Sequence, residues 1–159
     1  MRRIDSATPN DIPQLCALLA ILFAQEADFQ PDEVKQSAAL RTILSKPETG
    51  CILVMREGEK TLGMVNLLYT ISTACGGRVA LLEDMVVHPD YRQDGIGSQL
   101  LNSAKTWAQR TGCLRLTLLT DRANEPAIRF YQRHGFELSA MIPLRLSLDT
   151  AVSTSPESD

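Results

Sequence analysis

The stretch of residues 81–101 restricts the possible folds more than any other part of the chain. It begins as an apolar run with β-branched valines, which predicts a buried strand that ends before Pro89. A short polar loop follows, and Gly95 and Gly97 then stand at the start of an amphipathic helical pattern. The sequence therefore predicts a strand, a loop and a helix N-terminus in direct succession.

The predicted helix N-terminus has the properties of an anion-binding site. Its first backbone N–H groups lack partners within the helix, and the helix dipole is positive there. Gly95 and Gly97 carry no side chain, so an anion can approach the backbone closely. A Walker loop is excluded because the chain has no Gly-Lys pair, and a dinucleotide loop would need a third glycine where Leu100 stands. The stretch therefore predicts a site for a phosphate or pyrophosphate group.

A second motif covers residues 124–136. Asn124 is expected to cap a helix that has Pro126 in its first turn. Phe130 and Tyr131 are expected to pack inward, and Gly135 to end the helix in a left-handed conformation. A structural role accounts for each of these residues taken separately.

Together the two motifs resemble the signatures of the GNAT acyltransferase superfamily. Arg92, Gly95 and Gly97 match its Arg/Gln-x-x-Gly-x-Gly/Ala signature, and residues 124–136 match its Asn-x-x-Ala-x-x-x-Tyr-x-x-x-Gly-Phe block. The resemblance is good over residues 62–136, and the first sixty residues follow it only in the order of their elements. Gln93 and Asp94 depart from the pattern, because family members more often carry Gly, Arg or Lys there. An aspartate beside a pyrophosphate is repulsive unless its side chain points to water.

The resemblance implies a mixed α/β (α+β) fold of about seven strands and about four helices, splayed between the fourth and fifth strands. Hydrophobic periodicity gives the order strand, two helices, three strands, helix, strand, helix and two final strands. The last two strands are expected to start at Phe136 and to span residues 142–148. We expect one domain over residues 1–148 and a flexible tail over residues 149–159, which are rich in Ser, Thr, Pro and Glu.

The resemblance also implies acetyl-coenzyme A (acetyl-CoA) as co-substrate. In this family the pantetheine arm lies between the splayed strands, backbone amides after the fourth strand hold the pyrophosphate, and the second motif lines the remaining groove. The cofactor-binding residues implied in this way are Met85, Val86, Val87, Arg92, Gln93, Asp94, Gly95, Ile96, Gly97, Ser98, Asn124, Ala127 and Phe130.

Acetyl transfer to an amine requires a base for the ammonium proton and an acid for the departing thiolate. Glu83 is our candidate base, because a charged residue within an apolar strand needs an explanation, although an ion pair would also explain it. Tyr131 is our candidate acid from its motif position, and the alternative is a core tyrosine with a satisfied hydroxyl. We assign no catalytic role to His88 or His134, and no covalent step to the cysteines.

The acceptor is expected to be the primary amine of a small molecule. Glu26 and Asp84 are acidic and are our candidates for attracting it, although a solvated loop is the better explanation for either residue taken singly. The similarity of residues 82–92 and 124–126 to spermidine/spermine acetyltransferases makes a polyamine one specific hypothesis. The alternatives are a protein or peptide N-acetyltransferase and a non-catalytic acyl-CoA-binding module.

Composition limits the other partners. The formal net charge is −3 without a local basic cluster, so we expect no nucleic acid. No apolar run is long enough to span a membrane and no signal peptide is recognisable, so we expect no membrane contact and a cytoplasmic location. The four cysteines are scattered, which predicts neither a metal site nor disulfides. The family resemblance allows a homodimer through the late strands, although no residue establishes it.

Overall fold

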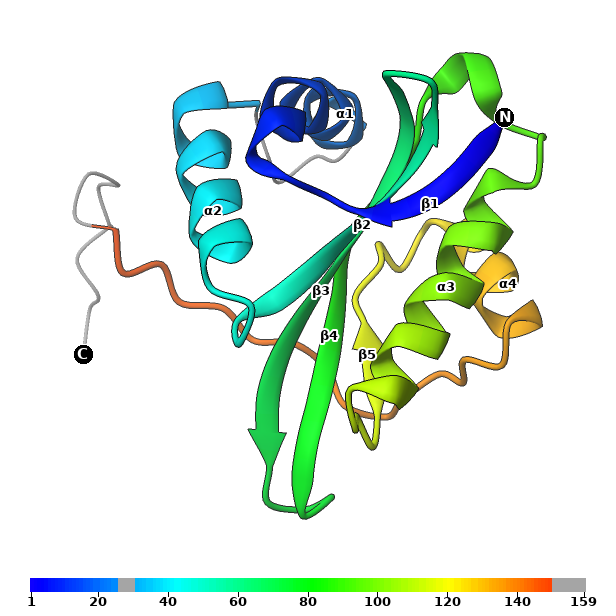
Figure 1. Ribbon diagram of the computed structural model, residues 1–159. Coiled ribbons are helices and arrows are strands. Elements are labelled where there is room, and N and C mark those ends of the chain that lie inside the picture. The colour runs from blue at the N-terminus through cyan, green and yellow to red at the C-terminus, as the bar shows by residue number, and fades with distance from the viewer. Residues whose placement is uncertain (26–30, 150–159) are drawn as a thin grey trace, which may run out of the picture.

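The computed structural model describes residues 1–25 and 31–149 (Figure 1). These residues form a mixed sheet with helices on both faces, in the order β1 (Arg2–Ser6), a 3-10 turn η1 (Pro9–Asp11), α1 (Ile12–Ala24), α2 (Glu33–Ser45), β2 (Gly50–Glu57), β3 (Lys60–Ser72), β4 (Gly77–Val87), a 3-10 turn η2 (Pro89–Tyr91), α3 (Ile96–Arg110), β5 (Leu116–Leu118) and α4 (Glu125–Arg133). The sheet order is β1-β2-β3-β4-β5, antiparallel except for the parallel pair β4–β5.

The helices lie on both faces of the sheet (Figure 1), and an apolar core holds them on each face. On one face, α3 packs through Leu100, Leu101 and Ala104 against buried side chains of β2, β3 and β4. On the other face, Leu15 and Leu19 of α1 join apolar residues of α2, β2 and β3. The sheet is therefore buried on both faces, which agrees with the largely apolar sequences of β2 and β3.

A β-bulge interrupts β4 at Asp84. Met64 pairs with Val86 and Asn66 pairs with Glu83, so β4 holds one residue more than β3 over this interval. Asp84 has a φ of 53°, which is uncommon for a residue other than glycine. On a regular strand, the side chains of two residues that are three positions apart point to opposite faces. Because of the additional residue in β4, Leu82 and Met85 both contact the core beneath α3.

The predicted splay between the fourth and fifth strands is confirmed. β5 pairs with β4 only at Ala80, Leu81 and Leu82. The β4 residues from Glu83 to Val87 continue beyond the last of these pairs and have no partner in β5. One edge of β4 is therefore open next to the loop that leads into α3.

The fold class and the four helices agree with the sequence prediction, but the strand number is wrong. The described residues form five strands where we expected about seven, and residues 136–149 contain none of the two late strands. A strand needs a neighbouring strand to complete its hydrogen-bond ladder, and no strand of the described chain pairs with this segment. The boundary between domain and tail at residue 148 stays a prediction, because residues 150–159 lie outside the description.

Within residues 1–25 and 31–149, no helix combines the length and the apolar content that crossing a lipid bilayer requires.

A buried ion pair fixes the entry into α1. Asp11 accepts hydrogen bonds from both terminal nitrogens of Arg56 on β2, with a distance of 2.7 Å from Nη2 to Oδ2. Asp11 also accepts a hydrogen bond of 2.7 Å from the backbone N–H of Thr8, which precedes the 3-10 turn. The hydrogen bonds from Arg56, which outweigh the opposing effect of burial, lower the pKa of Asp11.

We predict that Asp11→Asn lowers the free energy of unfolding at neutral pH by about 2 kcal/mol, because the partly buried Arg56 would lose its charge-assisted hydrogen bonds to Asp11 and keep only the one to Asp5. Because the pKa of Asp11 is lower in the folded than in the unfolded state, its carboxylate stabilises the fold at pH values above the unfolded pKa of about 3.9. This stabilisation is lost as the pH falls through the folded pKa. Urea unfolding at several pH values would measure this, and the variant is expected to lose part of the acid dependence. The exposed Asp90→Asn is the matched control, and equal stability of the two variants would contradict the prediction.

Candidate active site

The loop between β4 and α3 has a conformation that depends on glycine. Gln93 and Gly95 have φ values of 74° and 78°, and Gly95 is the N-cap of α3. No side chain caps this helix, so the N-terminal amides of α3 are not covered by a capping group. The local structure is therefore the uncapped helix N-terminus that the sequence predicts.

A shallow pocket of about 270 Å³ lies at this helix N-terminus. Gly97 forms part of its wall, since a Cβ at that position would lie 3.6 Å from Phe130, 3.7 Å from Met85 and 3.9 Å from Val87. The geometry fits the pyrophosphate end of a coenzyme A molecule, because the glycine leaves space beside backbone amides. The predicted residues that line the pocket are Val87, Arg92, Gln93, Gly95, Ile96, Gly97, Ser98 and Phe130.

The structure explains how an aspartate is tolerated beside this pocket. Asp94 does not line it, and its Oδ2 accepts a hydrogen bond of 3.1 Å from Nη2 of Arg2. Arg2 also binds Glu57 at 3.0 Å, so β1 and β2 together hold the Asp94 side chain. The negative charge of Asp94 is therefore paired with a cation.

The other predicted cofactor residues lie around the pocket in different environments. Arg92 donates through Nε to the carbonyl oxygen of Val87 at 3.2 Å, which links the loop to the end of β4. Val86 is buried in the core beneath α1, so only its backbone can face a ligand. Asn124 caps α4 by accepting from the backbone N–H of Ala127 at 3.2 Å, and neither residue lines the pocket.

Tyr131 lies against β4 where β4 has separated from β5. Its hydroxyl donates to Sδ of Met85 at 3.7 Å, and its ring contacts Phe130 and Phe136. A thioether is a weak hydrogen-bond acceptor, so a ligand could replace Met85 as the acceptor of the Tyr131 hydroxyl. Burial raises the pKa of Tyr131, which keeps the hydroxyl protonated at neutral pH.

Glu83 and Asp84 bring two carboxylates together at the bulge. Burial and the adjacent charge of Asp84 raise the pKa of Glu83, and the positive charge of Arg145 opposes this rise. Burial also raises the pKa of Asp84, although Nδ2 of the buried Asn66 donates to its Oδ2 at 3.3 Å. Glu26, the other residue predicted to attract the amine substrate, lies outside the described residues.

Comparison with known proteins identifies the family. The profile of the Acetyltransferase (GNAT) family matches residues 16–136, which is most of the chain. The chain belongs to this family. It is therefore an acyltransferase of a family that uses acetyl-CoA, and the resemblance seen in its two motifs is confirmed.

Two relatives and one solved structure show how close the similarity is. The uncharacterized N-acetyltransferase YhfO of Bacillus subtilis is 31% identical over 76% of this chain and 83% of its own. The aminoalkylphosphonate N-acetyltransferase of Salmonella typhimurium is 31% identical over 84% of this chain and 83% of its own. The aminoglycoside N-acetyltransferase AAC(6')-Iy in complex with CoA shares the fold, with a TM-score of 0.78 at 18% identity over 94% of this chain and 96% of its own.

Two residues at the site of this GNAT chain were not identified from the sequence. Tyr91 lines the pocket, and its hydroxyl accepts a hydrogen bond of 2.8 Å from Nζ of Lys60. His134 lies 3.1 Å from Oγ of Ser98 through its Nε2, so that α4 contacts the first turn of α3. Each contact joins segments more than 30 residues apart, and no local pattern signals it.

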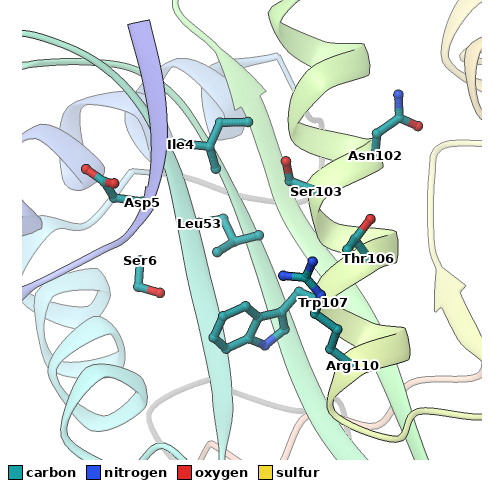
Figure 2. Close-up of a pocket in the computed structure, with 9 residues that line it drawn as sticks. All are labelled: Ile4, Asp5, Ser6, Leu53, Asn102, Ser103, Thr106, Trp107 and Arg110. Atoms are coloured by element: carbon teal, nitrogen blue, oxygen red, sulfur yellow. The ribbon is translucent and has the colours of Figure 1, made fainter.

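A larger hollow of about 520 Å³ lies elsewhere, between β1 and α3 (Figure 2). Trp107 and Arg110 of α3 and Asp5 of β1 line it. Asp5 is already paired with Arg3 and Arg56, and none of the predicted catalytic or cofactor residues lines this hollow. Eight of the predicted cofactor residues line the smaller pocket instead.

We predict that Gly97→Val weakens the binding of CoA at least about tenfold, because the larger side chain would contact Phe130, Met85 and Val87 and fill part of the pocket. Valine and glycine differ little in helix propensity, so the fold should remain stable. Isothermal titration calorimetry with CoA measures the effect. Gln99→Val on the exposed side of the same helix is the control, and equal affinity of the two variants would refute this placement of the ligand.

Proposed function

We propose that this GNAT enzyme transfers the acetyl group of acetyl-CoA to the primary amine of a small molecule, by direct attack within a ternary complex. The observation that carries the proposal is the position of the Tyr131 hydroxyl, which reaches Met85 where β4 has separated from β5. This places a protonated phenol next to the open edge of β4. The ring of Tyr131 also contacts Phe130, which lines the pocket at Gly95 and Gly97. The proposed proton donor thus contacts Met85 on the strand edge, and Met85 lies next to Gly97 in the proposed anion site.

The cofactor would be held by groups that the pocket already gathers. The backbone amides near Gly95 and Gly97 would bind the pyrophosphate, and the open edge of β4 at Met85 and Val87 would bind the pantetheine arm. Asn124 and Ala127 would line the outer part of the groove, at the start of α4. The pairing of Asp94 with Arg2 supports this arrangement, because it reduces the repulsion between the loop and the anion.

The proposed reaction moves protons at three points. Glu83 would accept a proton from the ammonium group, directly or through a water molecule, and the free amine would form a bond to the thioester carbonyl carbon. The C–S bond would then break, the nitrogen would lose its second proton to water, and Tyr131 would donate its proton to the thiolate. Glu83 would release its proton to solvent, and Tyr131 would regain one from solvent. The raised pKa of Glu83 makes its carboxylate a stronger base, and the raised pKa of Tyr131 keeps its proton available at neutral pH.

The acceptor would approach the side of the bulge, where Glu83 and Asp84 attract a cationic amine. The relative named for aminoalkylphosphonates supports a small molecule as acceptor, because a small amine is the substrate class in its name. A screen of aminoalkylphosphonates, polyamines, amino acids and peptides, which follows free thiol release from acetyl-CoA, tests the substrate class. Turnover of peptides alone, or CoA binding without turnover of any amine, would overturn the proposal.

We predict that Tyr131→Phe lowers kcat about 100-fold and leaves the affinity for CoA within about twofold, because only the donated proton is lost. Steady-state kinetics and calorimetry measure the two effects. Tyr69→Phe is the matched control, since it removes a hydroxyl that Nε1 of Trp107 contacts at 2.7 Å outside the pocket. Equal activity of the two variants would exclude Tyr131 as the acid.

We predict that Glu83→Gln lowers kcat/KM about 100-fold and changes its pH dependence. Glu83 acts in its deprotonated form, so the activity of the natural enzyme should fall as the pH drops through its raised pKa. The variant should lose this acidic limb in a profile of kcat/KM against pH. Glu59→Gln, at an exposed position of the turn between β2 and β3, serves as control, and an unchanged profile in Glu83→Gln would exclude the assignment.

A further inference from the structure

The hollow between β1 and α3 has the size of a small-molecule site and lies apart from the residues of the proposed reaction (Figure 2). Its volume of about 520 Å³ falls within the range of roughly 300–1,000 Å³ that is usual for pockets that bind small ligands. It shares no lining residue with the pocket of about 270 Å³ at the N-terminus of α3. A ligand of this hollow would therefore be distinct from the proposed cofactor.

The wall formed by α3 contains polar side chains that lack partners. Among the Ser and Thr residues of helices α1 to α4, only Ser103 and Thr106 have hydroxyls that make no hydrogen bond within the described part of the chain. The bonded hydroxyls are those of Ser37, Thr42, Ser45 and Ser98. Ser103 and Thr106 both line the hollow, together with Asn102 and Arg110. These positions are spaced along one face of α3, so their polar groups can act on one ligand.

The charges at the hollow favour an anion. Within residues 1–25 and 31–149, the side chain of Arg110 forms no ion pair, and Figure 2 shows its guanidinium directed from α3 toward the strands. The carboxylate of Asp5 lies on the far side of β1 from α3 in the same view. It is paired with Arg3 at 2.7 Å and with Arg56 at 3.1 Å. An anion in the hollow would therefore face the charge of Arg110, while the charge of Asp5 is directed away and neutralised.

The floor of the hollow is apolar and fixed in place. Leu53 belongs to the core beneath α3, and Ile4 and Trp107 pack against this core. Nε1 of Trp107 donates a hydrogen bond of 2.7 Å to the hydroxyl of Tyr69, which fixes the orientation of the indole. A planar apolar group gains contact area on such a ring without having to immobilise it first.

We propose that the hollow between β1 and α3 binds a small aromatic carboxylate. The carboxylate would accept two parallel hydrogen bonds from the guanidinium of Arg110, which is the geometry that these two groups prefer. The aromatic ring would pack against Trp107 and Leu53. An uncharged apolar ligand would leave Arg110 without a counter-ion, and an inorganic anion would leave the apolar floor in water. An aromatic carboxylate satisfies both parts of the hollow.

The first test uses the fluorescence of Trp107, the single tryptophan of the chain, which reports directly on the hollow. Benzoate, phenylacetate and 3-phenylpropanoate are the probes, each compared with its neutral amide. At least one carboxylate should change the fluorescence in a saturable way and bind at least about tenfold more tightly than its amide, which lacks the ion pair. The absence of a saturable change with all three carboxylates, or equal affinity of carboxylate and amide, would overturn the proposal.

The second test assigns the binding to Arg110. Arg110→Gln should weaken the binding of the best carboxylate at least about tenfold and leave that of its amide within about twofold. Arg41→Gln, at an exposed position of α2, is the matched control and should leave both unchanged. Because Arg110 is exposed, the variant should keep its fold, which circular dichroism verifies. Equal affinities of the two variants for the carboxylate would contradict the assignment.

The third test separates the hollow from the cofactor pocket. Saturating CoA should leave the affinity for the carboxylate within about twofold, because the two pockets share no residue. Displacement of the carboxylate by CoA would overturn the location. The fluorescence titrations and the two Arg variants require no acetyl transfer, so this proposal and the proposed function fail separately.

Discussion

Three parallel residue pairs hold β5 against β4, and the arrangement of the site depends on where they end. Leu82 and Leu118 form the last pair, and beyond it β4 continues alone to Val87. Longer pairing would close the strand edge with main-chain hydrogen bonds and leave no room for a ligand between the strands. If β5 separated from β4 earlier, it would no longer support α4, whose Tyr131 packs against the core beneath α3. The short ladder is thus a compromise between rigidity and access.

The proposed anion site and the proposed proton donor lie on elements that meet at this opening. The glycine loop is held by the end of β4 through Arg92 and Val87, and by β1 through Arg2 and Asp94. The first turn of α3 meets the end of α4 through Ser98 and His134. A site that must bind a large flexible cofactor benefits from such preorganisation, because fewer groups lose freedom on binding.

Local patterns in the sequence predicted the parts of the site that depend on neighbouring residues. Gly95 and Gly97 marked the helix N-terminus, and Asn124 marked the start of α4, because capping and turn preferences act over a few positions. The partner of Asp94 could not be predicted, since Arg2 lies 92 positions away. The alternating apolar residues of 142–148 predict a strand, and none forms there. Whether a strand forms also depends on a neighbouring strand, which no sequence period specifies.

The bulge at Asp84 has a consequence for how sequences of this type can diverge. The one additional residue in β4 brings Leu82 and Met85 to the same face and leaves Glu83 and Asp84 beside Asn66. Substitutions along β4 alter one contact at a time. Loss of a single codon before Met85 would instead turn the following side chains to the opposite face, since the side-chain period of a strand is two. The fold should therefore tolerate a substitution in this strand more readily than a change in the length of the strand.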